Sequence, residues 1–269
     1  MQILSRELSK RIKINSLKMV NKAKASHIGS ALSIADIVAV LYAEILTVNP
    51  NNPDEAIRDR FILSKGHACV AIYAALSEMG FFPAKDLETY GDDYSPLMNH
   101  ISHKVPGVEF STGALGHGLP FAVGKALFCK RNNLGWRTFV LLSDGELDEG
   151  SNWEALMFAA HHQLDNLTVI IDYNKLQSLT SIDKTLGLEP LADKFRAFGA
   201  SVVELDGHDH DALSRNLKEK GVNRPMVIIA HTTKGKGVSF MENQVLWHYR
   251  SPSDEQLIQA IKEIEAANA

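Results

Sequence analysis

The chain has 269 residues, 45% of them hydrophobic, so it is long enough to bury a sizeable core and approaches the upper limit for one core. Its 28 basic and 32 acidic residues are scattered, which excludes the massed positive charge of a nucleic-acid partner. The N-terminus lacks an apolar signal core, and no run approaches the roughly 20 apolar residues of a membrane helix, so we expect no membrane partner and a cytoplasmic location for one domain of residues 1–269.

Helical periodicity alternates with short apolar runs, which is typical of an α/β fold. Helices are predicted over residues 4–23, 67–79, 117–131, 151–162, 209–220 and 253–267. A further helix is predicted to begin at Ser33, because Ser33 and Asp36 fit a capping box and apolar side chains from Ile34 to Ile45 fall on one face. Cys69 and Cys129 lie in apolar helical stretches, which favours buried free thiols in a reducing compartment.

Five short runs predict strands, at Phe61–Leu63, Thr138–Leu142, Leu167–Ile171, Ser201–Leu205 and Met226–Ala230. They are apolar on both faces, so they read as parallel strands buried under helices. The predicted fold is therefore a mostly parallel central sheet flanked by helices on both faces, with an N-terminal helical region and a C-terminal helix. Small or polar residues follow every run, and in an open parallel sheet these loops share the carboxyl edge, where ligands bind.

The most specific pair of loop residues is Asp144 and Asn174, which follow consecutive strands on either side of a helix of about 12 residues. A right-handed crossover brings their side-chain oxygens together, and such oxygens suit Mg²⁺, whose coordination shell a diphosphate would complete. Gly145 lets the backbone approach that phosphate. The alternative is an ordinary turn at Asp144-Gly145 and a simple cap at Asn174.

Asp144-Gly145, Glu149-Gly150 and Asn174 together resemble the motif by which thiamine diphosphate enzymes hold their metal and diphosphate. Other stretches resemble transketolase in particular and follow the order of that family: Ser26–Gly29, Leu63–Ala68, Pro106–Glu109, Thr112–Gly118 and Trp247-His248. The resemblance spans nearly the whole chain and concerns the N-terminal, diphosphate-binding domain of the family.

The resemblance implies roles for individual residues. The ligands of Mg²⁺, for which Ca²⁺ or Mn²⁺ could substitute, would be Asp144, Asn174 and the backbone carbonyl of Leu176. The residues contacting thiamine diphosphate would be His67, Gly113, Ala114, Leu115, Asp144, Gly145, Glu146, Asn174, Lys234 and His248. The catalytic residues around the reacting carbon would be His27, His67, His100 and His248. Imidazole suits this work because it exchanges protons near neutral pH and can both donate and accept hydrogen bonds.

Other positions are expected to be structural or depart from the family pattern. Structural roles are predicted for His161, His162, His208 and His210, because no cysteine or carboxylate completes a zinc set. His103 is expected to be an exposed neighbour of His100. His117 stands where full-length transketolases often have Gln, Ile28 where the family has Pro, and Ser143 where a Gly is often found.

The resemblance implies the N-terminal subunit of a split transketolase, which moves a two-carbon ketol unit from a ketose, expected to be phosphorylated, to an aldose. In the family a glutamate on a pyrimidine-binding domain starts deprotonation of the cofactor, and this sequence has no counterpart of that domain. Glu149 and Glu154 instead resemble carboxylates that link cofactor sites across a subunit interface. We therefore expect the partner to be a separate C-terminal transketolase subunit, in an α2β2 heterotetramer serving the pentose phosphate route or a specialised sugar pathway.

Several alternatives are less consistent with these residues. The α subunit of a thiamine-dependent 2-oxo acid dehydrogenase carries the same metal motif, but the four histidines suit a polyhydroxylated substrate better. A deoxyxylulose phosphate synthase is normally one long chain. A non-catalytic module that binds thiamine diphosphate would not need all four histidines. A Rossmann nucleotide domain is disfavoured, since no Gly-x-Gly-x-x-Gly motif follows the first strand.

Overall fold

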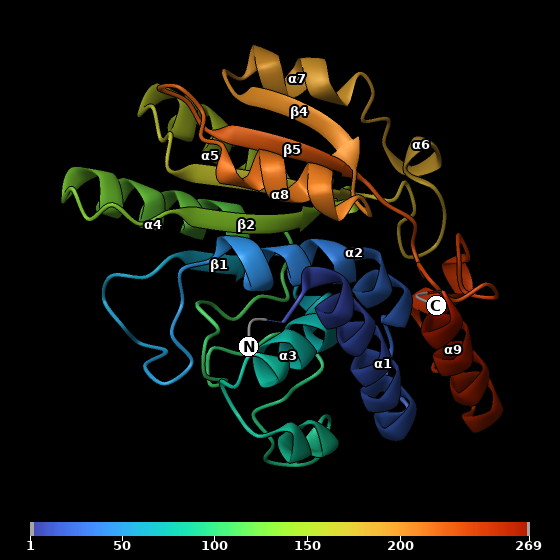
Figure 1. The fold of residues 1–269 in the computed structure, drawn as a ribbon. Helices are drawn as coiled ribbons and strands as arrows, with labels where there is room; N and C mark the ends of the chain where they lie inside the picture. The colour runs from blue at the N-terminus through green and yellow to red at the C-terminus, as the bar shows by residue number, and fades with distance from the viewer. Residues whose placement is uncertain (1–2, 268–269) are drawn as a thin grey trace.

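The computed structural model describes residues 3–267, so residues 1, 2, 268 and 269 of the predicted domain lie outside the described part. Its centre is a five-stranded, entirely parallel sheet in the order β1-β2-β3-β5-β4 (Figure 1). The strands are β1 Arg60–Leu63, β2 Thr138–Ser143, β3 Leu167–Tyr173, β4 Ser201–Asp206 and β5 Met226–His231. The register pairs Leu63 with Leu141 and Ile171 with Ile229, so β1, β2, β3 and β5 end along one edge.

Alternate residues of the strands face two hydrophobic cores on opposite sides of the sheet. Phe139, Leu141 and Ile228 belong to the first core, whereas Val140 and Val169 belong to the second. The first is covered by α1 Ser5–Ala23, α2 Ile28–Val40, α3 Cys69–Glu78, α8 His210–Lys218 and α9 Asp254–Ala266. The second is covered by α4 Gly118–Arg131, α5 Gly150–His161 and α7 Leu191–Ala197, seen above the sheet in Figure 1. Helices on both faces confirm the predicted fold class.

The helix predicted to begin at Ser33 in fact begins at Ile28, and the predicted capping box is wrong. Every residue of α2 from Ile28 to Val40 is buried, so the helix is enclosed on all sides rather than on one face. Ser33 and Asp36 lie inside it, and their side chains bond to residues distant in sequence instead of the helix end. A π-helical segment, η1 Leu41–Ile45, continues α2.

The prediction that no run approaches the composition of a membrane helix is also wrong for this segment. Residues Ile28–Ile45 have a mean hydropathy of 1.7 over 18 residues, which is long and apolar enough for a span. However, 89% of that segment is buried inside the protein. A core helix that must be apolar all round has the same composition.

Short helical segments complete the fold, and several of them were not predicted. They are η2 Gly66–Ala68, η3 Ala84–Thr89, η4 Gly145–Asp148, α6 Ile182–Thr185 and η5 Val245–His248, and α7 was not predicted either. The predicted burial of all strands on both faces is wrong for β4, which is an edge strand with Glu204 and Asp206 exposed. Cys69 and Cys129 are both buried and free of disulfides.

Candidate active site

A cleft of about 250 Å³ lies at the carboxyl edge of the sheet, where the loops after β1, β2, β3 and β5 meet the start of α2. It brings together most of the residues predicted from sequence: His27, His67, His100, Gly113, Leu115, Asp144, Gly145, Asn174, Leu176, Lys234 and His248. These residues come from segments spread over more than 200 positions of the chain, and parallel strand topology gathers them at one edge.

Asp144 and Asn174 lie at one end of the cleft, each held by neighbouring backbone. The carboxylate of Asp144 accepts hydrogen bonds from the amides of Gly145 at 2.7 Å and Lys175 at 2.5 Å. The side-chain oxygen of Asn174 accepts from the amide of Leu176 at 3.0 Å. Burial and the neighbouring Asp172 carboxylate raise the pKa of Asp144 to about 7. An anionic Asp144 is therefore disfavoured there unless a positive charge arrives.

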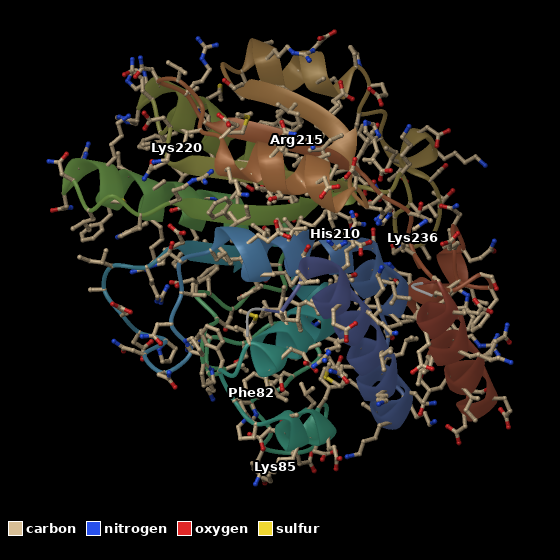
Figure 2. All side chains as sticks on the ribbon, in the orientation of Figure 1. Phe82, Lys85, His210, Arg215, Lys220 and Lys236 are labelled. Atoms are coloured by element: carbon tan, nitrogen blue, oxygen red, sulfur yellow. The ribbon has the colours of Figure 1, made fainter. Side chains whose placement is uncertain are left out.

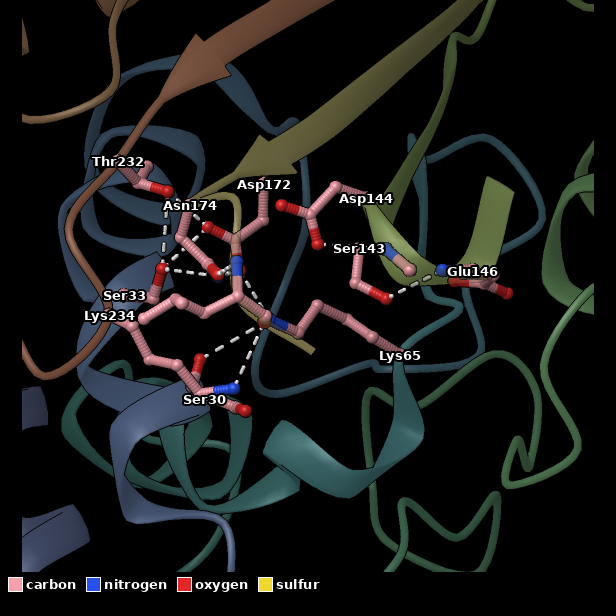
Figure 3. A network of polar contacts seen from close by, with 12 residues as sticks. Ser30, Ser33, Lys65, Ser143, Asp144, Glu146, Asp172, Asn174, Thr232 and Lys234 are labelled. Carbon is pink, nitrogen blue, oxygen red and sulfur yellow. Dashed lines mark hydrogen bonds and ion pairs between the residues drawn. The ribbon is translucent and has the colours of Figure 1, made fainter. Parts of the chain in front are cut away.

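A buried network beneath the cleft fixes Asn174, and sequence reasoning gave its central residues no role. Asp172, at the end of β3, accepts hydrogen bonds from Ser33 at 2.5 Å, Thr232 at 2.5 Å and Asn174 at 3.0 Å, and pairs with Lys65 (Figure 3). Although burial alone would raise the pKa of Asp172, Lys65 and the hydroxyl donors hold it below its usual value. The Asn174 amide nitrogen is thus committed to Asp172, which leaves its oxygen toward the cleft.

Lys234 crosses the cleft from the loop after β5. Its ammonium donates to the carbonyls of Leu176 and Gln177, both at 3.2 Å, and lies 3.1 Å from Nδ1 of His248. Burial and the nearby Lys65 ammonium lower the pKa of Lys234 to about 8. The Lys234 side chain is still mainly charged at neutral pH, so the cleft carries a positive group suited to an anion.

Four histidine rings gather at the other end of the cleft. The ring centroid of His27 lies 5.1 Å from that of His67, 5.8 Å from His100 and 5.0 Å from His248. His27 has a left-handed backbone with φ of 75°, and its amide donates to the carbonyl of His248 at 2.8 Å. This bond joins the start of α2 to η5 and turns both imidazoles toward one space.

The rings of this cluster are uncharged at neutral pH. Burial, followed by the nearby His100 and Lys234, lowers the pKa of His27 to about 4. Burial and Lys234 lower the pKa of His248 to about 3, and burial and Lys65 lower that of His67 as well. Neutral imidazoles can each accept one hydrogen bond and donate another, which suits recognition of several hydroxyl groups.

Two of the predicted cofactor contacts do not line the cleft. Glu146 is fully buried in η4, where its carboxylate accepts from Ser64 at 2.5 Å and from the amide of Gly116 at 2.9 Å. Its side chain points away from Asp144 and Asp172 in Figure 3. Ala114 is exposed and lies outside the residues that line the cleft. The sequence motif placed both residues near the cofactor, but helical geometry in η4 and burial behind the loop decide otherwise for Glu146.

Further cleft residues were not singled out from the sequence, namely Ser30, Lys65, Gln177, Ser178 and Tyr249. Tyr249 follows His248 directly, and its ring lies 4.8 Å from the His248 ring. A Cβ at Gly145 would come within 2.9 Å of Gln177, so the glycine is what lets the 174–178 loop close against the end of β2. The only available sign of Lys65 and Asp172 was their position directly after or within apolar runs.

The remaining histidines lie apart from the cleft. His208 and His210 both bond to Asp36, and His103 bonds to Ser111 at 2.7 Å on the surface. His117 bonds to the carbonyl of Leu115. Within residues 3–267, no group of three or more His, Cys, Asp or Glu side chains is placed to hold a metal ion. A site built from one carboxylate, one amide and one carbonyl is of a different kind.

Comparison with known proteins places the chain. The family profile described as "Transketolase, thiamine diphosphate binding domain" matches residues 4–266. One of the named subunits of the apulose-4-phosphate transketolase of Phocaeicola vulgatus is 40% identical over 267 residues, covering 98% of this chain and 95% of that one. The 6-deoxy-6-sulfo-D-fructose transketolase subunit SqwG of a Clostridium species is 37% identical, with 94% of each chain covered. A crystal structure of Campylobacter jejuni transketolase matches with a TM-score of 0.92 at 30% identity, covering 98% of this chain but 43% of that one.

The parallel sheet with its polar cleft at the carboxyl edge is the thiamine diphosphate-binding domain of an α/β enzyme. This chain belongs to the transketolase family. The prediction of an N-terminal transketolase subunit is confirmed, because relatives named as subunits of two-chain transketolases match it over nearly their whole length. The chain spans less than half the length of the solved full-length transketolases.

Proposed function

We propose that Asp144, Asn174 and the carbonyl of Leu176 hold a Mg²⁺ ion that binds the diphosphate of thiamine diphosphate. Three oxygen donors of the kind Mg²⁺ prefers lie at one end of the cleft, two of them oriented by backbone amides. The raised pKa of Asp144 fits this proposal, because a buried carboxylate without a counter-charge is what an incoming divalent ion stabilises.

The diphosphate would lie against Gly145, His67, Lys234 and His248. Lys234 brings a positive charge into the same end of the cleft, and Gly145 offers backbone without a side chain in the way. His67 and His248 present neutral rings that can donate hydrogen bonds to phosphate oxygens. These residues supply both charge and directed donors, which is the usual provision for a phosphate group.

The histidine cluster would bind and orient a sugar. When bound, thiamine diphosphate supplies a nucleophilic carbon and an electron sink for breaking a carbon–carbon bond. His27, His67, His100 and His248 surround the space beside it, and their neutral rings can hold substrate hydroxyls and move protons to and from them. The reaction we propose is transfer of a two-carbon ketol unit from a phosphorylated ketose to an aldose.

We further propose that the active enzyme needs a separate C-terminal subunit, in an α2β2 assembly. Two relatives that match this chain nearly end to end carry names of transketolase subunits, and in Campylobacter jejuni transketolase the matching part is 43% of one chain. The partner would supply the glutamate that contacts the aminopyrimidine ring. The printed substrates of the two relatives, apulose 4-phosphate and 6-deoxy-6-sulfo-D-fructose, make a specialised sugar a candidate alongside pentose phosphates.

The observation that carries the proposal is the set of four histidines beside the oxygen donors, and His100→Ala tests it. His100 is exposed at the cleft and its ring lies 5.8 Å from His27, so its loss should remove a substrate contact without disturbing the core. We expect ketol transfer by the assembled enzyme to fall by about 10²-fold or more, as for loss of a general acid–base group, with thiamine diphosphate affinity unchanged.

The control for this test is His103→Ala, three residues away and bonded to Ser111 on the surface. It should leave both transfer and cofactor affinity unchanged. A His100→Ala enzyme with full ketol transfer would contradict the proposed catalytic site. It would favour a non-catalytic module that only binds the cofactor. An enzyme that released CO₂ from 2-oxo acids instead would favour the dehydrogenase alternative.

A further inference from the structure

His208 connects a buried carboxylate to the loop that carries Lys234. Its Nδ1 lies 2.7 Å from the carboxylate of Asp36, and its Nε2 accepts the amide of Thr233 at 2.9 Å. Because a backbone N–H can only donate, Nε2 must be the unprotonated nitrogen, so the ring proton resides on Nδ1 and is donated to Asp36. The two contacts together fix one tautomer and one ring orientation.

Asp36 is a rigid anchor for this imidazole. It lies inside α2 and is buried, and its carboxylate also accepts hydrogen bonds from Ser9, from Lys13 at 2.9 Å and from His210. Burial alone would raise its pKa, but Lys13 and the two histidines hold the pKa of Asp36 well below its ordinary value. The carboxylate therefore stays charged and accepts from His208 throughout the neutral range.

The loop held by His208 is the one that enters the cleft. Thr232 donates to Asp172, and the amide of Gly235 donates to the carbonyl of Gly29 at 3.0 Å. Thr233 lies between these two anchors and directly before Lys234, and its amide bond to His208 is the third fixed point. Lys234 must hold its backbone still to keep its ammonium on the carbonyls of Leu176 and Gln177.

We infer that His208, oriented by Asp36, is a positioning residue that fixes the Thr232–Gly235 loop so that Lys234 meets the cofactor. The inference rests on the proposed function for the identity of the cofactor, but not for the position of the loop. It gives a role to a histidine that the sequence alone marked as structural. Residues that orient a ligand-binding group from behind commonly change ligand affinity by 10-fold to 100-fold when replaced.

His210 is a matched control, because it shares the anchor but not the loop. Its Nε2 lies 3.2 Å from Asp36 and its Nδ1 lies 3.0 Å from Ser5, and these described hydrogen bonds reach none of residues 232–235. In Figure 2 it lies where α8 meets the N-terminal helices, on the same side of the sheet. A role limited to stability would therefore be shared by both histidines, whereas the positioning role belongs to His208.

Two substitutions separate the two contacts of His208. His208→Gln places an amide oxygen near the position of Nε2, where it can accept the Thr233 amide, and gives up the bond to Asp36. His208→Asn places an amide near Nδ1, where it can donate to Asp36, and loses Thr233. The readouts, on the full chain, are amide hydrogen exchange of residues 230–237 and the affinity for thiamine diphosphate in the presence of Mg²⁺.

We expect His208→Asn to speed exchange of the loop and to weaken thiamine diphosphate binding, each by about 10-fold, and His208→Gln to restore both close to wild type. His210→Gln should lower the midpoint of thermal unfolding but leave loop exchange and cofactor affinity unchanged. The inference is overturned if Asn and Gln act equally at position 208, or if the His210 variant loosens the loop as much as His208→Asn.

A measurement on the unmodified chain covers the case in which the variants do not fold. With ¹⁵N-labelled histidine, His208 should show a protonated Nδ1, an unprotonated Nε2, and a scalar coupling from Nε2 to the Thr233 amide. A protonated Nε2 would refute the inference. If the wild-type chain bound no thiamine diphosphate with Mg²⁺, the proposed function would fail, while the loop exchange and the nitrogen signals would still decide the role of His208.

Discussion

Asp144 illustrates how surroundings set the behaviour of a single residue. It lies 1% exposed at the end of β2, with Asp172 nearby and two backbone amides directed at its oxygens. The desolvation of its charge and the repulsion from Asp172 outweigh those two amide bonds, so its pKa rises to about 7. A strand-end aspartate therefore becomes a group whose charge depends on whether a cation is present.

This shift predicts a stability that depends on pH. Since the pKa of Asp144 is raised from 3.8 to about 7 on folding, the folded chain binds a proton there that the unfolded chain has released. In the absence of divalent cations, this residue should lower the free energy of unfolding by up to about 1.4 kcal/mol per pH unit as pH rises from 4 to 7. Chemical denaturation of wild type and Asp144→Asn across this range measures the difference in slope.

The same linkage predicts the response to Mg²⁺. Saturating Mg²⁺ with thiamine diphosphate should remove the loss of stability toward pH 7 in wild type, because a bound cation favours the charged carboxylate. Asp144→Asn should show neither the slope nor its removal. Identical slopes for the two proteins would mean that Asp144 is already charged in the folded chain at low pH.

At the scale of elements, the Lys65–Asp172 pair joins the ends of neighbouring layers. Lys65 follows β1 and Asp172 ends β3, and hydroxyl groups from α2 and from the loop after β5 complete the shell of the carboxylate. Their side chains are 1% and 0% exposed, so neither charge could be left without the other at small cost. The network ties together the four segments that form the floor of the cleft.

We therefore expect Lys65→Met to lower the free energy of unfolding by about 3–5 kcal/mol, because it strands the buried Asp172 charge. The double variant Lys65→Met/Asp172→Asn should lose less, since no unpaired charge remains. Urea denaturation measures both. The control is Lys130→Met, which removes the partner of Asp165 from a pair 36% and 38% exposed and should cost about 0–1 kcal/mol. Equal losses for Lys65→Met and Lys130→Met would contradict this account.

For the whole molecule, the cleft is formed by residues at one edge of the sheet and stays open toward solvent at Tyr249, which is 58% exposed. The histidine rings are thus half-covered in the chain by itself. Under the proposed function, the second subunit would cover this edge and bring the remaining groups to the cofactor. Activity would then be a property of the assembly, not of either chain.

This gives a prediction for the purified chain. Alone, with Mg²⁺ and thiamine diphosphate, it should show no ketol transfer from a ketose phosphate to an aldose. Transfer should appear when the C-terminal subunit is added, and light scattering after size-exclusion chromatography should give the mass of two copies of each chain. Full transfer by the chain alone would refute the two-subunit proposal, and a mass of one copy of each would refute the stoichiometry only.

Much of the fold followed from local patterns in the sequence. The apolar runs identified all five strands, and the helices near residues 4–23, 117–131, 151–162, 209–220 and 253–267 lie within a few residues of their predicted ends. These patterns succeed because a parallel strand covered on both faces, or a helix with one covered face, must repeat apolar residues at its own period. The start of α2 was misjudged because an enclosed helix has no polar face to mark its phase.

The sequence by itself determined which residues would meet at the carboxyl edge, because strand ends in a parallel sheet share that edge whatever the details of packing. Only the tertiary structure decided how they are supported. The pairing of Lys65 with Asp172, the retreat of Glu146 behind its loop and the bond from His208 to Thr233 all join residues far apart in the chain. Such contacts depend on the distances between packed elements, and no local pattern in a sequence encodes a distance between segments that only folding brings together.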